Sequence, residues 1–144
     1  MGLDQYAFAV MPSKDNTDFK WVWTVAEATE GKITEIAYWR KHPNLQGWME
    51  NLWLKKRAMQ GVTETATEGL LAGEVVFNCE PIRLTVADLD LLESAVKGEI
   101  LPETEGFFFG DNSDEYYKEA DLKFIEDART AILQDMEVYY YSWW

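Results

Sequence analysis

The chain has 144 residues, and its 26 Asp and Glu against 13 Lys and Arg give a formal net charge of −13. Hydrophobic residues make up 47% of the chain and aromatic residues 15%, which predicts one folded domain over residues 1–144 with a substantial core. Cys79 is the only cysteine and His42 the only histidine, so an intramolecular disulfide is excluded and a structural zinc site is not expected.

The acidic residues are concentrated in the C-terminal part of the chain. Residues 1–59 hold seven acidic and eight basic residues, whereas residues 60–144 hold 19 and five. Like-charge repulsion then disfavours direct binding to nucleic acids and anionic membranes. No apolar run approaches the roughly 18 residues of a membrane span, and the N-terminus lacks a secretory pattern, so we expect a soluble cytoplasmic protein.

Several segments have the β-branched and aromatic composition of strands and are bounded by Gly, Pro, Asn or Asp. In chain order they are 6–11, 19–25, 33–40, 74–84, 107–109 and 138–144. Helices and short turns separate them. This order predicts a single α+β domain with a largely antiparallel sheet of five or six strands and about three helices packed on it.

The first predicted helix follows Pro43, a residue suited to a first helical turn. Its apolar residues recur at helical spacing: Leu45, Trp48, Met49, Leu52 and Trp53. We also expect Trp39 or Trp48 to lie in the packed interior.

The second predicted helix begins at the N-cap Thr85, with Asp88 three residues later as a variant of the capping box, and ends at Gly98. Leu89, Leu92 and Val96 give it one apolar stripe.

The third predicted helix is capped by Ser113 or Asp111 and reaches about Gln134. Its predicted apolar face consists of Tyr117, Ala120, Phe124, Ala128 and Ile132. The tail that follows alternates two aromatic-bearing faces, so we expect a strand paired with strands of the N-terminal half, and its second face is available to a partner or a homodimer.

The densest polar group lies where segment 33–40 ends. Arg40 offers a planar fork of donors, Lys41 a point charge and His42 a titratable ring, just before a helix N-terminus. With Tyr38 and Trp48 nearby to stack on a base, these residues predict a site for a phosphate or carboxylate. The alternative is a structural Arg40, paired with an acid such as Asp4.

Other chemistries have weaker signals. The segment Gly106–Gly110 has bulky aromatic residues between its glycines and no Lys-Ser/Thr after them, so it is not a phosphate loop. A Ser-His-acid or Cys-His mechanism would have to use His42, and no nucleophile-elbow pattern accompanies it. Asp111, Asp114 and Glu115 do not have the spacing of an EF-hand, and helix capping explains two of them. We therefore expect no metal, no cofactor and no catalytic residue.

Four segments carry a family resemblance: the opening MGLD, EIAYWRKHPNLQGWME, LPETEGFFFGDNSDEYYKEADL and the tail YYYSWW. Over nearly its whole length the chain resembles a family of small, mostly phage and bacterial proteins often labelled phosphoglycerate kinase. The sequence departs from the family pattern at Gln46, where the pattern has His. The resemblance implies a phage or prophage origin and a working place in the host cytoplasm.

The kinase label does not fit the length of the chain. A phosphoglycerate kinase is a two-domain protein several times longer, with separate sites for its two substrates, so that activity is excluded. Two hypotheses from different classes follow. The first is a non-catalytic binding protein for a small anionic, nucleotide-like ligand, held beside Arg40 and Lys41. The second is an acidic inhibitor of a host nucleic-acid-binding or defence enzyme.

Overall fold

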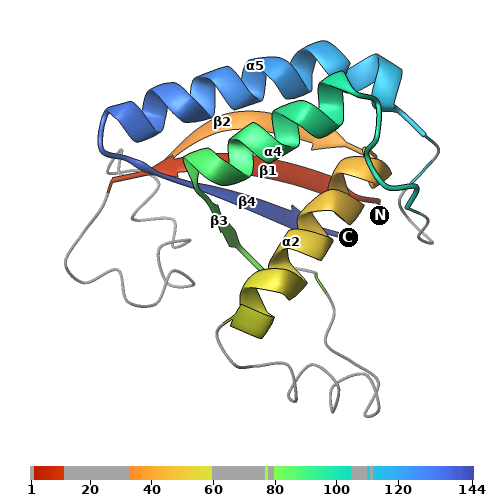
Figure 1. Cartoon of the computed structure of the whole chain (residues 1–144), viewed down its shortest axis with the longest axis horizontal. Helices are drawn as coiled ribbons and strands as arrows, with labels where there is room; N and C mark the ends of the chain where they lie inside the picture. Colours follow the sequence, from red (N-terminus) through yellow and green to blue (C-terminus); the bar gives the residue numbers. More distant parts are fainter. Residues whose placement is uncertain (1, 12–32, 60–76, 78–79, 105–109, 111) are drawn as a thin grey trace.

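The computed structural model describes residues 2–11, 33–59, 77, 80–104, 110 and 112–144. Figure 1 shows the elements in chain order. They are β1 (Asp4–Val10), β2 (Ile33–Arg40), α2 (Pro43–Met59), β3 (Ile82–Leu84), α4 (Val86–Lys97), α5 (Asp114–Leu133) and β4 (Glu137–Trp143). The fold is α+β, as predicted.

The four strands form one antiparallel sheet in the order β2-β1-β4-β3. The C-terminal strand therefore lies inside the sheet and pairs with β1 from the start of the chain, which confirms the predicted pairing of the tail. Five or six strands were expected. Four lie in the described part of the chain, and the predicted segments 19–25 and 107–109 are outside it.

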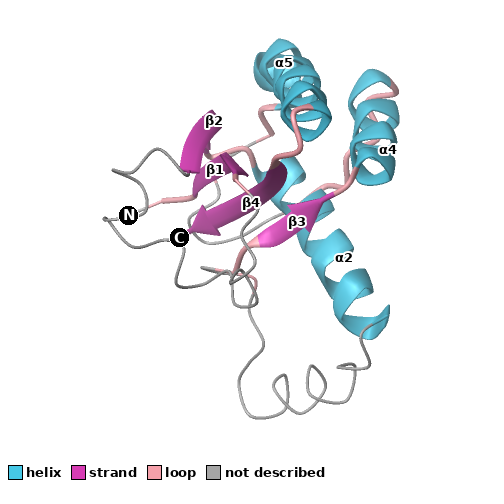
Figure 2. Cartoon of the chain, turned by 90° about the vertical axis from the view of Figure 1, so that its left-hand side faces the viewer, coloured by secondary structure: helices cyan, strands magenta, loops and turns pink. Residues whose placement is uncertain are grey.

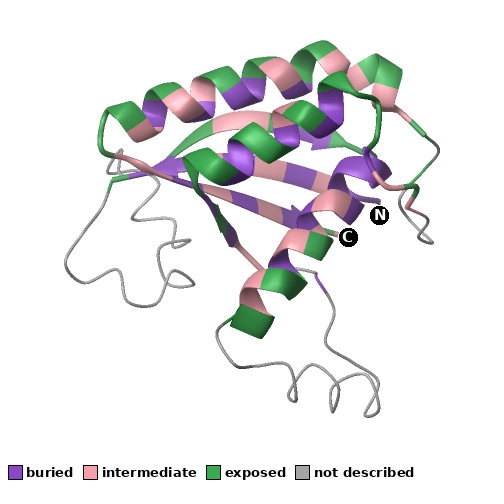
Figure 3. Ribbon diagram, in the orientation of Figure 1, coloured by how far each residue is buried: buried purple, intermediate pink, exposed green. Residues whose placement is uncertain are grey.

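The three helices of the described residues lie on one face of this sheet (Figure 2). Side chains that point toward them alternate with side chains of the other face, so that Gln5, Ala7 and Ala9 of β1 are buried while Tyr6 and Phe8 are only partly so (Figure 3). The core lies between the sheet and the helices. Its largest fully buried side chains include Trp39, Phe77, Phe124, Leu45, Met49, Leu89, Leu92, Ile125 and Tyr140.

The tail has the two faces that its sequence predicts. Val138, Tyr140 and Ser142 are buried beneath the helices, whereas Tyr141 is half-buried and Trp143 is 57% exposed on the opposite face. Period-2 alternation accounts for both sets. A partner or homodimer contact at the second face stays a prediction.

Trp39 is 1% exposed and packs edge-on against Phe124 of α5, with ring centroids 5.1 Å apart. Trp48 is half-buried and packs against the core from α2. The glycine within α2 has a steric cause, since a Cβ at Gly47 would collide with the side chain of Thr104. The predicted core role of a tryptophan is thus met by Trp39.

The predicted apolar face of α5 is partly wrong. Phe124 and Ala128 are buried, but Ala120 is exposed and its neighbour Asp121 is buried in its place. The buried face of α5 is therefore rotated relative to the predicted apolar face, because the carboxylate of Asp121 lies where the apolar pattern placed Ala120. That carboxylate is the starting point of the candidate site.

Candidate functional site

Two of the residues predicted from the sequence lie together on the face of the sheet away from the helices. Arg40 Nη1 is 2.9 Å from Asp4 Oδ1, and the Tyr38 hydroxyl donates to the same oxygen at 2.7 Å. This ion pair is the structural alternative that the sequence left open for Arg40. It ties the start of β1 to the end of β2, where Asp4 and Arg40 face each other in register.

The other three predicted residues lie elsewhere. Lys41 is exposed, Trp48 belongs to α2, and His42 is completely buried beneath α5. Lys41 has a φ of 55°, a left-handed conformation that is uncommon for a residue with a Cβ. This turn carries the chain from the end of β2 into the interior, and strained backbone of this kind is concentrated at functional sites.

His42 is held on all sides. Its backbone N–H donates to Gln5 Oε1 at 2.9 Å, and its carbonyl accepts from Gln5 Nε2 at 3.0 Å. Its ring stacks on Tyr117, with centroids 4.8 Å apart, and the Tyr117 hydroxyl is bonded to both the N–H and the carbonyl of Arg40. The ring therefore has a fixed position between β2 and α5.

A buried carboxylate sets the chemistry of this ring. His42 Nε2 lies 2.9 Å from Asp121 Oδ2, and Trp39 Nε1 donates to Asp121 Oδ1 at 2.8 Å. Asp121 is 1% exposed. Burial raises the pKa of Asp121 above its ordinary value of 3.8, against the opposing effect of the hydrogen bonds from His42 and Trp39. A carboxylate bound to one ring nitrogen fixes the tautomer of the ring.

The other ring nitrogen faces the N-terminus of α5. His42 Nδ1 lies 3.2 Å from Ser113 Oγ, which is also 3.1 Å from the carbonyl of Lys41. Ser113 is the N-cap of α5, as predicted, but its side chain makes no capping hydrogen bond. We define the His42 cluster as Trp39, His42, Ser113 and Asp121.

Asp114, the first residue of α5, has one satisfied and one unsatisfied oxygen. Its Oδ2 accepts from Asn44 Nδ2 at 3.0 Å. Its Oδ1 is buried, has no hydrogen-bond partner in the part of the chain that the structure describes, and lies 3.9 Å from His42 Nδ1, outside hydrogen-bonding range. An unpaired buried acceptor costs free energy, so it marks a place where a donor would bind.

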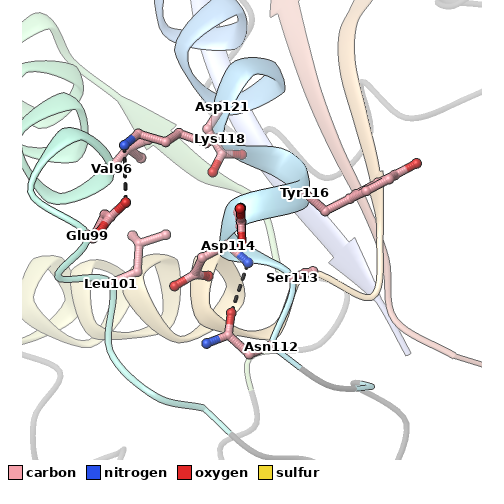
Figure 4. A pocket seen from close by; sticks show the side chains of 10 residues that line it. Val96, Glu99, Leu101, Asn112, Ser113, Asp114, Tyr116, Lys118 and Asp121 are labelled. Carbon is pink, nitrogen blue, oxygen red and sulfur yellow. Dashed lines mark hydrogen bonds and ion pairs between the residues drawn. The ribbon is translucent and has the colours of Figure 1, made fainter.

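A cavity of about 820 Å³ opens beside these residues, between the C-terminal end of α4 and the first turns of α5 (Figure 4). We call it the α5 pocket. It is lined by Val96, Glu99, Leu101, Asn112, Ser113, Asp114, Glu115, Tyr116, Lys118 and Asp121. Asp114, whose Oδ1 has no partner among the described residues, therefore lines the same pocket as Ser113 and Asp121 of the His42 cluster.

Its charged side chains are mostly acidic. Among the described residues of the lining, four carboxylates stand against the amine of Lys118, which itself pairs with Glu99 at 3.3 Å. Figure 4 shows this pair and the bond from the Asp114 N–H to Asn112 Oδ1, which is 2.9 Å long.

A second polar network lies deeper in the core. Gln5 Nε2 donates to the Tyr140 hydroxyl at 2.8 Å, and that hydroxyl donates to Gln46 Oε1 at 2.6 Å. Burial raises the pKa of Tyr140 well above its ordinary value. Gln46, at the position where the resembling family has His, is a structural partner of this network.

No protein-family model matches the sequence, and comparisons with curated proteins and with solved structures find no match either. The family resemblance of the sequence therefore stays a prediction. In the part of the chain that the structure describes, no helix is long and apolar enough to span a membrane.

Asp111, Asp114 and Glu115 are the carboxylates whose spacing in the sequence does not fit an EF-hand. Asp111 lies outside the described residues. Among the residues that are described, no group of three or more His, Cys, Asp or Glu side chains is arranged to hold a metal ion.

Asp121 is not among the residues predicted from the sequence, and Ser113 is predicted only as a helix cap. A usable signal was present. Asp121 is four residues after Tyr117 and three before Phe124, which places a carboxylate on the apolar stripe of the helix. A charged residue on a buried face must be paired, and His42, the one histidine of the chain, was a candidate for its partner.

Proposed function

We propose that the protein binds a small ligand in the α5 pocket and that the ligand presents a protonated amine, or another cationic donor, to Asp114. The observation that carries this proposal is the buried Oδ1 of Asp114, which has no hydrogen-bond partner among the described residues. Leaving such an acceptor unpaired costs about 1–3 kcal/mol. A donor from a ligand would recover that cost and add the attraction between opposite charges.

The charge of the pocket supports a cation rather than an anion. Glu99, Asp114, Glu115 and Asp121 line it, and the amine of Lys118 is already paired. The sequence suggested the opposite charge because Arg40 and Lys41 were read as free donors. Arg40 pairs with Asp4 instead. A binding function is therefore kept, but the expected ligand is positively rather than negatively charged.

The test is a titration of the full chain with putrescine, a diamine, and with adenosine monophosphate, the anionic ligand class expected from the sequence. Calorimetry should give binding of putrescine that Asp114→Asn weakens at least tenfold. Glu126→Gln, an exposed residue of the same helix outside the pocket, is the matched control and should bind like the wild type. Binding of adenosine monophosphate alone, lost in Arg40→Gln, would refute the proposal in favour of the anion site.

The acidic-inhibitor hypothesis has less support in the described residues. On α5, acidic side chains are interleaved with basic ones rather than gathered in one array. Lys123 pairs with Asp127 at 2.9 Å, and Arg129 bridges Glu93 and Asp90 of α4. Paired charges of both signs are a poor imitation of a phosphate backbone.

A further inference from the structure

Ser113, His42 and Asp121 form a continuous chain of hydrogen-bonding groups at the edge of the α5 pocket. The contacts are 3.2 Å from Ser113 Oγ to His42 Nδ1 and 2.9 Å from His42 Nε2 to Asp121 Oδ2. A hydroxyl, an imidazole and a buried carboxylate in this sequence are the parts of an activated serine. They are recognised by geometry rather than by chain order.

The orientation of the ring is consistent with this chemistry. Asp121 accepts from Trp39 as well as from His42, so its carboxylate is fixed and holds the ring proton on Nε2. Nδ1 is then the free acceptor that faces Ser113. The ring is reversed relative to an arrangement with the carboxylate on Nδ1, but either nitrogen can act as the base when the other is bound.

The N-terminus of α5 supplies a second feature of such a site. Ser is among the preferred N-cap residues, yet the Ser113 hydroxyl is turned away from the helix N–H groups and toward Lys41 and His42. The first-turn N–H groups of a helix have no intrahelical acceptor, and they favour negative charge. The Asp114 N–H already donates to Asn112 Oδ1, so the helix dipole rather than this N–H would favour a developing oxyanion beside Ser113.

We propose that Ser113 is a nucleophile for acyl transfer from a small ester and that His42 is its general base, with Asp121 as a positioning residue. This inference rests on the proposed function, because the ester binds in the α5 pocket. Ser113 Oγ bonds to the carbonyl carbon and its proton passes to His42 Nδ1. The bond from carbon to the alcohol oxygen breaks, and the alcohol leaves with that proton.

Water completes the cycle. It attacks the Ser113 ester, gives its proton to His42, and the carbon–Oγ bond breaks as Oγ recovers that proton, which releases the carboxylic acid. The hydroxyl of Ser113 has one hydrogen and two acceptors, Lys41 O and His42 Nδ1. Rotation about the Cβ–Oγ bond is enough to direct it to His42.

The test uses the full chain and p-nitrophenyl acetate. We expect release of p-nitrophenolate and an acetyl group mapped to Ser113 by peptide mass spectrometry. Ser113→Ala should lower the rate at least about a hundredfold, because it removes the hydroxyl that His42 activates as general base. Ser94→Ala, an exposed serine of α4 outside the pocket lining, should keep the wild-type rate. Asp121→Asn should lower kcat more than it changes KM.

Either of two outcomes would overturn the inference. They are equal rates in the wild type and Ser113→Ala, or acetylation of the wild type at other residues but not at Ser113. Putrescine binding in the same samples separates this failure from that of the proposed function, since a protein that binds putrescine but is not acetylated retains the pocket and loses the nucleophile. If Ser113→Ala does not fold, the acetylation site in the wild type decides alone.

Discussion

The N-termini of α4 and α5 begin with similar residues and are built differently. At α4, Thr85 Oγ1 accepts from the Asp88 N–H at 3.2 Å, and Asp88 Oδ2 accepts from the Thr85 N–H at 2.9 Å. Each helix end has a hydroxyl residue followed by acids, but only α4 forms the reciprocal capping box. At α5 the hydroxyl of Ser113 bonds to a different part of the chain.

The difference separates a structural helix end from a candidate site. The capping box stabilises α4 by two reciprocal local hydrogen bonds, and Lys56 of α2 adds an ion pair to Asp88 Oδ2 at 2.6 Å. At α5 the N-cap Ser113 forms no capping hydrogen bond. Its hydroxyl lies beside the buried His42 instead, and Ser113 lines the α5 pocket. Departures from local rules are expected at functional sites, where another requirement has been met instead.

The pKa values of the buried acids in the two regions, Asp88 and Asp121, are shifted in opposite directions. Although burial opposes the change, hydrogen bonds from Lys56 and from the Thr85 backbone lower the pKa of Asp88. Burial raises the pKa of Asp121 and prevails over its hydrogen bonds to His42 and Trp39. The carboxylate of the capping box is therefore stabilised in its charged form, and the carboxylate of the His42 cluster is held at a cost.

The largest effect is expected from Asp121→Ala. This change leaves Trp39 Nε1 and His42 Nε2 without their acceptor in the core, and breaking a buried pair in this way costs about 3–5 kcal/mol. Urea denaturation followed by tryptophan fluorescence measures the loss. A cost of no more than about 0.5 kcal/mol, the range of an ordinary surface change, would show that the His42 cluster does not hold α5 to the sheet.

Thr85→Ala should cost about 1 kcal/mol, as the loss of a good N-cap does. Combined with Ser113→Ala, it should give the sum of the two single costs because the two helix ends share no partner. Ser113→Ala combined with Asp121→Asn should depart from additivity, since both act on His42. The account would be contradicted by strong energetic coupling between Thr85→Ala and Ser113→Ala together with simple additivity of Ser113→Ala and Asp121→Asn.

The pH dependence should differ in sign between the two acids. The contribution of Asp88 is present above the ordinary pKa of 3.8 and is lost as the pH falls through its lowered value. The contribution of Asp121 is fully present below 3.8 and is lost as the pH rises through its raised value. Lowering the pH should thus shrink the stability gap between wild type and Asp88→Asn and widen the gap to Asp121→Asn. Gaps that change in the same direction would contradict the assignment.

The smallest effect is expected from Lys118→Met at the rim of the α5 pocket. Its pair with Glu99 joins side chains that are 39% and 76% exposed, and surface pairs contribute about 0–1 kcal/mol. The free energy of unfolding should change within that range, while the affinity for putrescine rises because a competing cation has been removed. A weaker affinity would mean that Lys118 takes part in binding.

Local signals were sufficient for much of the fold. The strand at 33–40 and the helix from Thr85 to Gly98 have the predicted bounds, because composition and capping act over a few residues. The burial pattern of the tail also followed from its alternation. These features need no knowledge of distant parts of the chain.

The candidate site was much less predictable. Residues 42 and 121 are brought together by the packing of α5 on the sheet, and no short-range pattern encodes that contact. The cluster at Arg40 looked like a site because charges adjacent in sequence were assumed to face the same way. The chain turns at Lys41 instead, and directs Arg40 and His42 to different surroundings.

The most direct test of the His42 cluster is the protonation pattern of its imidazole. Because His42 is the one histidine of the chain, a ¹⁵N-labelled sample gives a single imidazole spin system that needs no assignment. At neutral pH we predict a proton on Nε2, bound to Asp121, and an unprotonated Nδ1 facing Ser113. A ring with its proton on Nδ1 would contradict the account, since that nitrogen could not accept the hydroxyl proton of Ser113.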